Sequence, residues 1–463
     1  MKSLPFDIGL IHFVGIGGIG MSGLAEILHN LGYKVQGSDL KSSSNTQRLN
    51  ALGIKTFVGH HAENINDVSA VVVSSAIPKN NPEIHQAEAN RLPILRRASM
   101  LAELMRMKWS IAIAGTHGKT TTTSLVGAML EEANLDPTVI NGGIINAYNS
   151  NTKLGQGDWL VAEADESDGT FTKLPSVIAC VTNIDPEHMD HYASFEDTKL
   201  AYKKFLQNVP FYGMAIMCLD HPIVQSMIPD LPAKKVITYG FSPQSDYRAT
   251  YLRYNDKGIY FDLKLKNGTL LHDVFLPMMG DHNVQNSLIA CAIADQLEIA
   301  PEIMVKALEK FVGVKRRFTH VATVNGITII DDYGHHPVEI NAVLNAARRA
   351  KPNSKIVAVM QPHRYTRLRD LFDEFCTCFN DADSVIITDI YAAGETPING
   401  LDQDHFVHSI QVAGHKDVQA LSDWSTLPAL LKDKVGEGDQ VICFGAGDIT
   451  KLAYDLPQMM EDC

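Results

Sequence analysis

A glycine-rich loop with a single lysine, GTHGKTTTT from Gly115, has the composition of a binding site for nucleotide phosphates. Its backbone N–H groups can wrap phosphate oxygens, Lys119 can neutralise their charge, and the Thr120 hydroxyl can bind Mg²⁺. The loop departs from the strict Walker A pattern, because the position six residues before the lysine is Ile113 instead of glycine. It still lies between an apolar stretch at 110–114 and a helical pattern from about 120 to 133. We therefore predict that residues 115–121 bind nucleotide phosphates.

Acidic residues and a histidine follow two further apolar stretches. EADESD begins at Glu163, directly after 159–162, and four carboxylates within six residues favour a bound cation over a merely solvated turn. Glu163 is the first candidate ligand for Mg²⁺. His188 follows the stretch 177–181 and lies beside Asp185 and Asp190 in the sequence. Because histidine is an unusual ligand for Mg²⁺, His188 suggests a second metal that bridges to substrate.

A second glycine loop stands near the start of the chain. Gly15, Gly17 and Gly20 form the pattern G-x-G-x-x-G between an apolar stretch at 10–14 and a helical pattern at 21–31, and Asp39 follows about 20 residues later. Such a loop lets the backbone approach a diphosphate at a helix N-terminus. A nicotinamide-dependent oxidoreductase remains an alternative on this loop alone, as does a tight turn that binds no ligand.

Two basic and aromatic segments lie in the last third of the chain. DDYGHHP begins at Asp331 and QPHRYTR at Gln361, each at the end of a predicted strand. The histidine pair His335–His336 would suit a transition metal, but no third ligand stands at a suitable spacing. The planar guanidinium of arginine suits a carboxylate. These segments could therefore hold a small amino acid.

The elements that must position these residues alternate between strands and helices, which predicts an α/β fold with parallel sheets. A length of 463 residues suggests three domains. We expect a Rossmann-like sheet in 1–105, a central P-loop ATPase-type sheet in 106–313 and a Rossmann-like α/β domain in 314–463. Alternating stretches between 239 and 276, with a hairpin turn at Asn267-Gly268, predict antiparallel strands appended to the central sheet.

The composition of the chain disfavours several classes of binding partner and indicates a cellular compartment. The net charge is −13, from 53 acidic and 40 basic residues, which disfavours nucleic acid and anionic membrane surfaces as partners. No apolar stretch approaches the roughly 18–20 residues that span a bilayer. The seven cysteines are scattered and form no CxxC pair, so a disulfide framework or structural zinc site is not expected. These features predict a cytoplasmic protein.

Taken together, the motifs resemble those of the Mur ligases, ATP-dependent amide-forming enzymes of peptidoglycan precursor synthesis. The resemblance covers essentially the whole chain and rests on an ordered series: GIGGIGMSG from Gly15, GTHGKTTTT from Gly115, EADESD from Glu163, NIDPEHMDHY from Asn183, GDHNVQNSLIA from Gly280, KRRF from Lys315, DDYGHHP from Asp331, QPHRYTR from Gln361 and FGAGD from Phe444.

The resemblance implies a reaction. ATP would phosphorylate the carboxylate of UDP-N-acetylmuramate, and L-alanine would attack the acyl phosphate to give an amide, ADP and phosphate. It implies ATP and two Mg²⁺ ions as cofactors. For the assembly we expect a monomer or a homodimer. A family alternative joins a recycled tripeptide to the same UDP-sugar, although GIGGIGMSG, EADESD and DDYGHHP favour L-alanine. A nucleotide-binding module without catalysis is a third reading.

The resemblance also implies roles for individual residues. Lys119, Glu163 and His188 would carry catalysis, with Thr120 and Glu163 on one Mg²⁺ and His188 on the second. ATP would be bound by Gly115, Thr116, His117, Gly118, Lys119, Thr120, Thr121, His282, Asn283, Asn286, Arg317 and Asp332. The UDP-sugar would be bound by Gly15, Gly17, Gly18, Gly20, Asp39, Ser74, Ser75 and Ala76. L-Alanine or the intermediate would be bound by Tyr333, His335, His363, Arg364 and Arg367.

Overall fold

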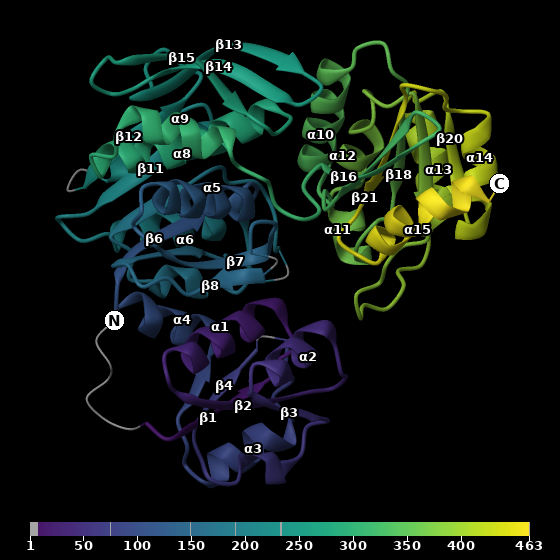
Figure 1. Cartoon of the computed structure of the whole chain (residues 1–463). Coiled ribbons are helices and arrows are strands. Elements are labelled where there is room, and N and C mark those ends of the chain that lie inside the picture. Colours follow the sequence, from purple (N-terminus) through teal and green to yellow (C-terminus); the bar gives the residue numbers. More distant parts are fainter. Residues whose placement is uncertain (1–7, 75, 149, 190, 232–233, 463) are drawn as a thin grey trace. The chain divides into compact units, whose positions relative to one another are not determined.

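The computed structural model describes residues 8–462 except 75, 149, 190, 232 and 233. The chain builds three sheets, each accompanied by helices (Figure 1). It divides into two compact units. One holds the chain up to Thr250 with Asp262–Val274 and Gln285–Gly313, and the other holds Tyr251–Phe261, Phe275–Val284 and the chain from Val314. The three predicted domain ranges stay a prediction.

The first sheet is parallel, with the strand order β3-β2-β1-β4-β5. This order reverses direction between β1 and β4, which is where doubly wound sheets bind ligands. The strands are β1 (Leu10–Val14), β2 (Lys34–Asp39), β3 (Lys55–Val58), β4 (Val68–Val73) and β5 (Ile94–Arg96). The helices are α1 (Ile19–Asn30), α2 (Ser44–Ala51), η1 (Ala62–Ile65), α3 (Pro82–Ala89) and α4 (Arg97–Met105).

The second sheet has the order β15-β14-β13-β12-β11-β10-β6-β9-β7-β8. Its centre is parallel, and β7 pairs with β8 in the antiparallel sense. The strands are β6 (Trp109–Ala114), β7 (Thr138–Ile145), β8 (Ser150–Lys153), β9 (Trp159–Glu163), β10 (Ile178–Val181), β11 (Met214–Cys218), β12 (Lys235–Gly240), β13 (Tyr247–Asn255), β14 (Gly258–Lys264) and β15 (Leu270–Leu276). The helices are α5 (Lys119–Glu132), η2 (Thr170–Lys173), α6 (Phe195–Gln207), α7 (Pro222–Ser226), η3 (Ile228–Asp230), α8 (Asp281–Gln296) and α9 (Pro301–Glu309).

The third sheet has the order β16-β17-β21-β18-β19-β20 and is parallel except for β16. Its strands are β16 (Thr319–Val324), β17 (Ile327–Asp332), β18 (Ile356–Met360), β19 (Ser384–Thr388), β20 (Val418–Leu421) and β21 (Gln440–Phe444). Its helices are α10 (Pro337–Ala350), α11 (Tyr365–Asp370), α12 (Phe372–Thr377), α13 (Gln403–Val412), η4 (Trp424–Thr426), α14 (Leu427–Lys432) and α15 (Ile449–Glu461).

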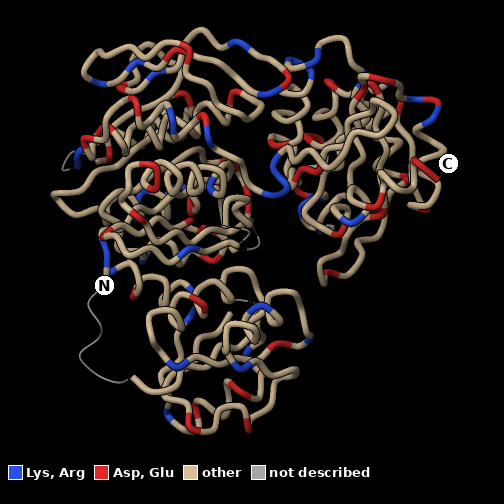
Figure 2. The backbone as a smooth tube through the Cα atoms, viewed as in Figure 1, with Lys and Arg blue, Asp and Glu red and all other residues tan. Residues whose placement is uncertain are grey.

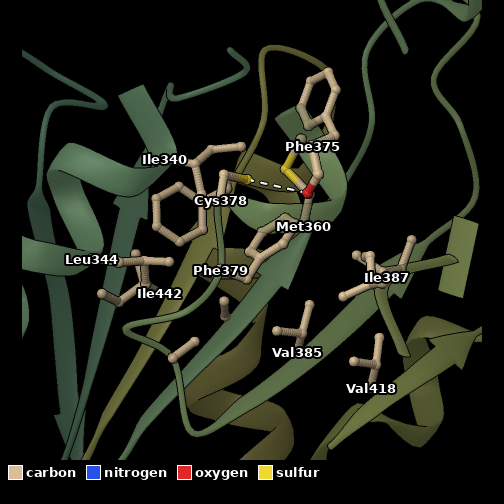
Figure 3. Close-up of a cluster of buried hydrophobic side chains, with 14 of the residues drawn as sticks. Ile340, Leu344, Met360, Phe375, Cys378, Phe379, Val385, Ile387, Val418 and Ile442 are labelled. Atoms are coloured by element: carbon tan, nitrogen blue, oxygen red, sulfur yellow. Dashed lines mark hydrogen bonds between the residues drawn. The ribbon is translucent and has the colours of Figure 1, made fainter. Parts of the chain in front are cut away.

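The core of the third sheet shows why its apolar strands are buried. On one face, side chains of α10 and α12, among them Ile340 and Phe375, pack with Val385 and Ile442 of the strands (Figure 3). On the other face, α14 and α15 cover a second apolar cluster. Strands covered on both faces are expected to be continuous apolar runs, as they are here.

Several predictions about the elements can be compared with this fold. The apolar stretches at 10–14, 110–114 and 159–162 correspond to β1, β6 and β9, and the Asn267-Gly268 turn joins β14 to β15. Acidic and basic residues are interspersed along the described backbone (Figure 2). Six cysteines within the described residues are free and buried. No helix in the described part of the chain is long and apolar enough to cross a membrane.

Candidate active site

The loop from Gly115 is held in a conformation that requires glycine. It runs from the end of β6 to the start of α5, the arrangement expected for a phosphate-binding loop. Gly115 has φ of 139° and Gly118 has φ of 83°. A Cβ on Gly115 would lie 1.9 Å from the Thr182 hydroxyl oxygen. The backbone can follow this path only without side chains at these positions.

Residues after the neighbouring strand β10 fix the loop. The His117 N–H donates to Asn183 Oδ1 at 2.7 Å, and the Thr182 hydroxyl donates to the His117 carbonyl at 2.6 Å. The Asp185 N–H donates to the Thr116 hydroxyl oxygen at 2.8 Å. The segment from Thr182 to Asp185 therefore shapes the phosphate loop.

The structure brings Thr120 and Glu163 together. The Thr120 hydroxyl donates to Glu163 Oε2 at 2.9 Å, and the Gly142 N–H donates to the same oxygen at 2.8 Å. A hydroxyl and a carboxylate are both oxygen ligands of the kind that Mg²⁺ prefers. The two residues therefore fit one cation site beside the loop. Thr121 is buried one position further along α5.

Lys119 is largely buried, with 13% of its side chain exposed, and forms an ion pair. Its ammonium donates to Glu166 Oε1 at 2.8 Å and to the carbonyl oxygens of Gly115 at 2.5 Å and Thr116 at 3.0 Å. Burial opposes the positive charge, but the carboxylates of Glu166 and Glu163 hold the pKa of Lys119 above its ordinary value. Burial also raises the pKa of Glu166 to about 7, against the attraction of Lys119. The lysine is therefore a cation at neutral pH.

His188 lies at a second possible cation site. Ligand atoms of Glu166, Glu187 and His188 all lie within 4.8 Å of one another. His188 has a positive φ of 56°, an uncommon conformation for histidine. Asp185 instead approaches the His117 and His221 rings, at 3.5 and 3.4 Å. Asp190 lies outside the described residues.

The predicted adenine contacts lie on or next to the start of α8. Asn286 is buried against the phosphate loop, since a Cβ on Gly118 would lie 2.7 Å from its Oδ1. Asn283 is also buried, and its amide donates to the Met279 carbonyl at 2.7 Å. The His282 ring packs against Gly280.

The first glycine loop is tied to the end of β2. The N–H groups of Gly15 and Ile16 donate to the Ser38 carbonyl at 2.8 and 2.9 Å. The Gly17 N–H donates to Asp39 Oδ2 at 2.8 Å. Asp39 therefore shapes the loop, whereas in a nicotinamide-binding site the acidic residue is expected on a ribose hydroxyl.

A cavity of about 250 Å³ joins the first glycine loop to Glu163. Its lining includes the predicted residues Gly18, Gly20 and Ser74. Ala76 is exposed, and its N–H donates to the Ser74 hydroxyl oxygen at 3.4 Å. Ser75 lies outside the described residues. A ligand held by the glycine loop can thus extend to the candidate Mg²⁺ site.

Two charged residues that line this cavity, Arg97 and Asp165, are not among the predicted site residues. Arg97, at the start of α4, contacts Asp165 with 3.0 Å between Nη2 and Oδ2. Burial opposes the charge of Asp165, but Arg97 and Lys119 hold its pKa below its ordinary value. In the sequence, Arg97 is distinguished only by its basic neighbour Arg96. Its proximity to Asp165, far along the chain, depends on the fold.

In the other compact unit, Asp332 is the last residue of β17 and Tyr333 follows it. Asp332 is buried, and its two oxygens accept the N–H groups of Phe318 and Gly334, both at 2.7 Å. Burial raises the pKa of Asp332, with Arg317 opposing the rise. The guanidinium groups of Arg316 and Arg317 lie 4.9 and 5.3 Å from the Tyr333 ring centre, within reach of a cation–π contact.

His335, His363 and Arg367 lie together at the same end of this sheet. The rings of His335 and His363 are 6.2 Å apart, and Arg367 Nη1 donates to His363 Nδ1 at 3.1 Å. Burial, and then Arg367, lowers the pKa of His363 to about 3, so its ring is neutral at pH 7. This neutral ring stacks on Tyr391 at 5.4 Å.

Arg364 directly precedes α11 and has a positive φ of 71°, a strained conformation for arginine. Its guanidinium lies 3.9 Å from Glu395. Glu395 also accepts the Thr366 N–H at 3.0 Å. Neither Tyr391 nor Glu395 was predicted, because the segment around them carries no recognisable motif.

Comparison with protein families gives three matches in sequence order. Residues 10–109 match the Mur ligase family catalytic domain, 113–294 the Mur ligase middle domain, and 316–447 the Mur ligase glutamate ligase domain.

Individual proteins match over the full length. The UDP-N-acetylmuramate–L-alanine ligase of Gluconobacter oxydans is 56% identical over 466 residues, covering 100% of this chain and 98% of the relative. The enzyme of the same name from Brucella anthropi is 55% identical, covering 99% of each chain. The crystal structure of UDP-N-acetylmuramate–alanine ligase from Thermotoga maritima superposes with a TM-score of 0.82 at 29% identity, covering 98% of this chain and 99% of that one.

Proposed function

This chain belongs to the Mur ligase family, and we propose that it joins L-alanine to the carboxylate of UDP-N-acetylmuramate with consumption of ATP. The observation that carries this proposal is the cavity lined by both the first glycine loop and Glu163. A UDP-sugar held by that loop would present its carboxylate to the phosphates of an ATP held by the second loop. The oxidoreductase alternative is disfavoured, because it gives no role to Lys119, Thr120 or Glu163.

For the first step, the loop from Gly115 to Thr121 binds the ATP phosphates, and Lys119 stabilises charge on the terminal phosphate. Thr120 and Glu163 fit one Mg²⁺, and His188 would hold a second. Such ions reduce the repulsion between a carboxylate and a triphosphate. Asn286, which packs against the loop, would orient the nucleotide together with His282 and Asn283. Arg317 and Asp332 would complete the nucleotide site.

For the second step, the neutral amine of L-alanine attacks the acyl phosphate and expels phosphate. Tyr333, His335, His363, Arg364 and Arg367 would hold the amino acid or the tetrahedral intermediate. Arginine provides a planar pair of donors for the carboxylate of L-alanine. Because His363 has a pKa of about 3, it would act as a neutral hydrogen-bonding group.

The UDP-sugar would be bound by Gly15, Gly17, Gly18, Gly20, Asp39 and Ser74 to Ala76. In this proposal Asp39 acts partly through the loop, since it already accepts the Gly17 N–H. The cytoplasm is proposed as the compartment because the reaction uses ATP. A monomer or a homodimer is proposed as the assembly.

The proposal is tested by phosphate release from ATP, Mg²⁺ and UDP-N-acetylmuramate with one of four acceptors: L-alanine, glycine, L-serine or the recycled tripeptide. L-Alanine should support the fastest release. Release with the tripeptide but not with L-alanine would assign the chain to tripeptide recycling instead. Binding of NADH without binding of the UDP-sugar would support the oxidoreductase alternative.

A further inference from the structure

All three N–H donors of Lys119 are occupied inside the protein. Two point to carbonyl oxygens of its own loop, and the third points to Glu166 at 2.8 Å. An ammonium group has only three donors. To contact a terminal phosphate, Lys119 must therefore give up at least one of these partners. Glu166 is the partner that would compete with phosphate most directly, because it also carries negative charge.

Glu166 would be left in an unfavourable position by that exchange. It is 2% exposed, and its second oxygen, Oε2, has no hydrogen-bond partner among the described residues. A buried carboxylate without its counter-ion is costly, and a nearby triphosphate would add repulsion. A positive group that replaces Lys119 beside Glu166 is therefore favoured when ATP binds.

The surroundings of Glu166 provide for such a replacement. Ligand atoms of Glu166, Glu187 and His188 lie within 4.8 Å of one another, and His188 Nε2 is 3.8 Å from Glu166 Oε1. Two carboxylates and an imidazole suit a divalent cation such as Mg²⁺ or Mn²⁺.

We propose that Glu166 exchanges Lys119 for a divalent cation when ATP binds, and that Glu187 and His188 are the other protein ligands of this cation. The inference rests on the proposed function, since it takes ATP as the ligand of the loop. Glu166 thereby makes the release of Lys119 to the phosphates depend on the second cation. Two of the three proposed ligands, Glu166 and Glu187, are carboxylates that the sequence motifs did not single out as ligands.

The test measures Mn²⁺ and nucleotide binding on the full-length chain. Mn²⁺ is titrated by electron paramagnetic resonance with and without adenylyl imidodiphosphate, a non-hydrolysable ATP analogue. Affinity for the analogue is also measured without any divalent cation. The wild type should bind a second Mn²⁺ only with the analogue present.

Glu166→Gln should change the two affinities in opposite directions. The second Mn²⁺ should bind at least about tenfold more weakly, because a charged ligand is lost. The analogue without metal should bind at least about threefold more tightly, because Lys119 is no longer held by a carboxylate. A residue with only a structural role would weaken both affinities together, and that result, like unchanged affinities, would overturn the proposal.

Two further variants keep the test decisive. Glu187→Gln should weaken the second Mn²⁺ without tightening metal-free binding, because the Lys119–Glu166 pair stays intact. Asp168→Asn is the matched control from the same acidic segment, since Asp168 accepts the Thr170 N–H at 3.0 Å and is outside the cation cluster. It should leave both affinities unchanged. Phosphate release by the wild type with L-alanine, measured in parallel, tests the proposed function separately from the exchange.

Discussion

Charge compensation at Lys119 is the central feature at the scale of single residues. The side chains of Lys119 and Glu166 are 13% and 3% exposed and lie 2.8 Å apart, so removing either one leaves the other without its charged partner. The loss of a single partner from a buried pair destabilises a protein more than the removal of both. This asymmetry allows the contribution of Lys119 to folding to be separated from its contribution to phosphate binding.

Lys119→Met should therefore lower the free energy of unfolding by about 3 kcal/mol. Adding Glu166→Gln should restore most of that loss. Phosphate release should fall by about 100-fold or more in both variants, because neither can neutralise the terminal phosphate. Urea unfolding measures the stability of each variant, and phosphate release from the same preparations measures its activity. Turnover that returned together with stability in the double variant would show that Lys119 serves folding alone.

A second buried carboxylate, Glu83 at the start of α3, supports the first glycine loop. It accepts from the Ser38 hydroxyl at 2.6 Å and from Asn64 at 2.7 Å, and it lies 3.4 Å from the His12 ring. Burial works against its charge, but contacts with His12, Ser38 and Asn64 lower the pKa of Glu83 to about 2. Ser38 in turn holds the loop through its carbonyl.

Lowering the pH should therefore reduce the free energy of unfolding, because the ionised Glu83 contributes to it. A carboxyl whose pKa is lower in the folded state stabilises the fold above its unfolded pKa of 4.5, and this contribution is lost as the pH falls from 4.5 towards 2. Its full size is about 3 kcal/mol. Glu83→Gln should be less stable than the wild type at pH 7, and the difference should shrink at pH 3. A difference that stayed constant between these two pH values would contradict the assignment.

At the scale of elements, the strand–loop–helix units were predictable because each is encoded locally. The apolar runs at β1, β6 and β9 and the glycines that follow β1 and β6 are visible as sequence patterns. The family resemblance assigned Thr120 and Glu163 to one cation, and the two side chains do meet, at 2.9 Å, where parallel strands place their carboxyl ends at one edge. The roles of the predicted site residues remain proposals.

Contacts between distant segments could not be read from the same patterns. Glu166 stood inside a recognised acidic segment, but only the fold shows that it pairs with Lys119. Arg97, at the start of α4 beside the first sheet, donates a hydrogen bond to Asp165, which follows β9 of the second sheet. Tyr391 approaches His363 through an isolated bridge between irregular segments. Periodicity carries no information about such pairs, because they depend on how the elements pack.

Gly115 provides a test of the loop as an element. Alanine at this position would place Cβ 1.9 Å from the Thr182 hydroxyl oxygen at a φ of 139°. Gly115→Ala should abolish measurable binding of an ATP analogue and lower the melting temperature. Gly436→Ala, at a glycine with open space around it, is the control and should change neither property. Calorimetry and thermal unfolding measure both effects, and normal nucleotide binding by Gly115→Ala would show that the loop can relax.

At the scale of the whole molecule, the proposed chemistry is distributed over three sheets. The first sheet carries the loop for the UDP-sugar, the second carries Lys119, Thr120 and Glu163, and the third carries the residues proposed for the amino acid. The first two meet within one compact unit, at the cavity between Gly20 and Glu163. The central claim is that ATP activates the carboxylate of the sugar at this cavity.

Isotope transfer tests that claim most directly. UDP-N-acetylmuramate labelled with ¹⁸O in its carboxylate is incubated with the enzyme, ATP, Mg²⁺ and L-alanine, and the released phosphate is analysed by ³¹P nuclear magnetic resonance. A carboxylate oxygen that attacks the terminal phosphorus leaves with phosphate when the amine forms the amide. Each phosphate released should therefore carry one oxygen from the carboxylate. Amide product with unlabelled phosphate would contradict an acyl phosphate intermediate.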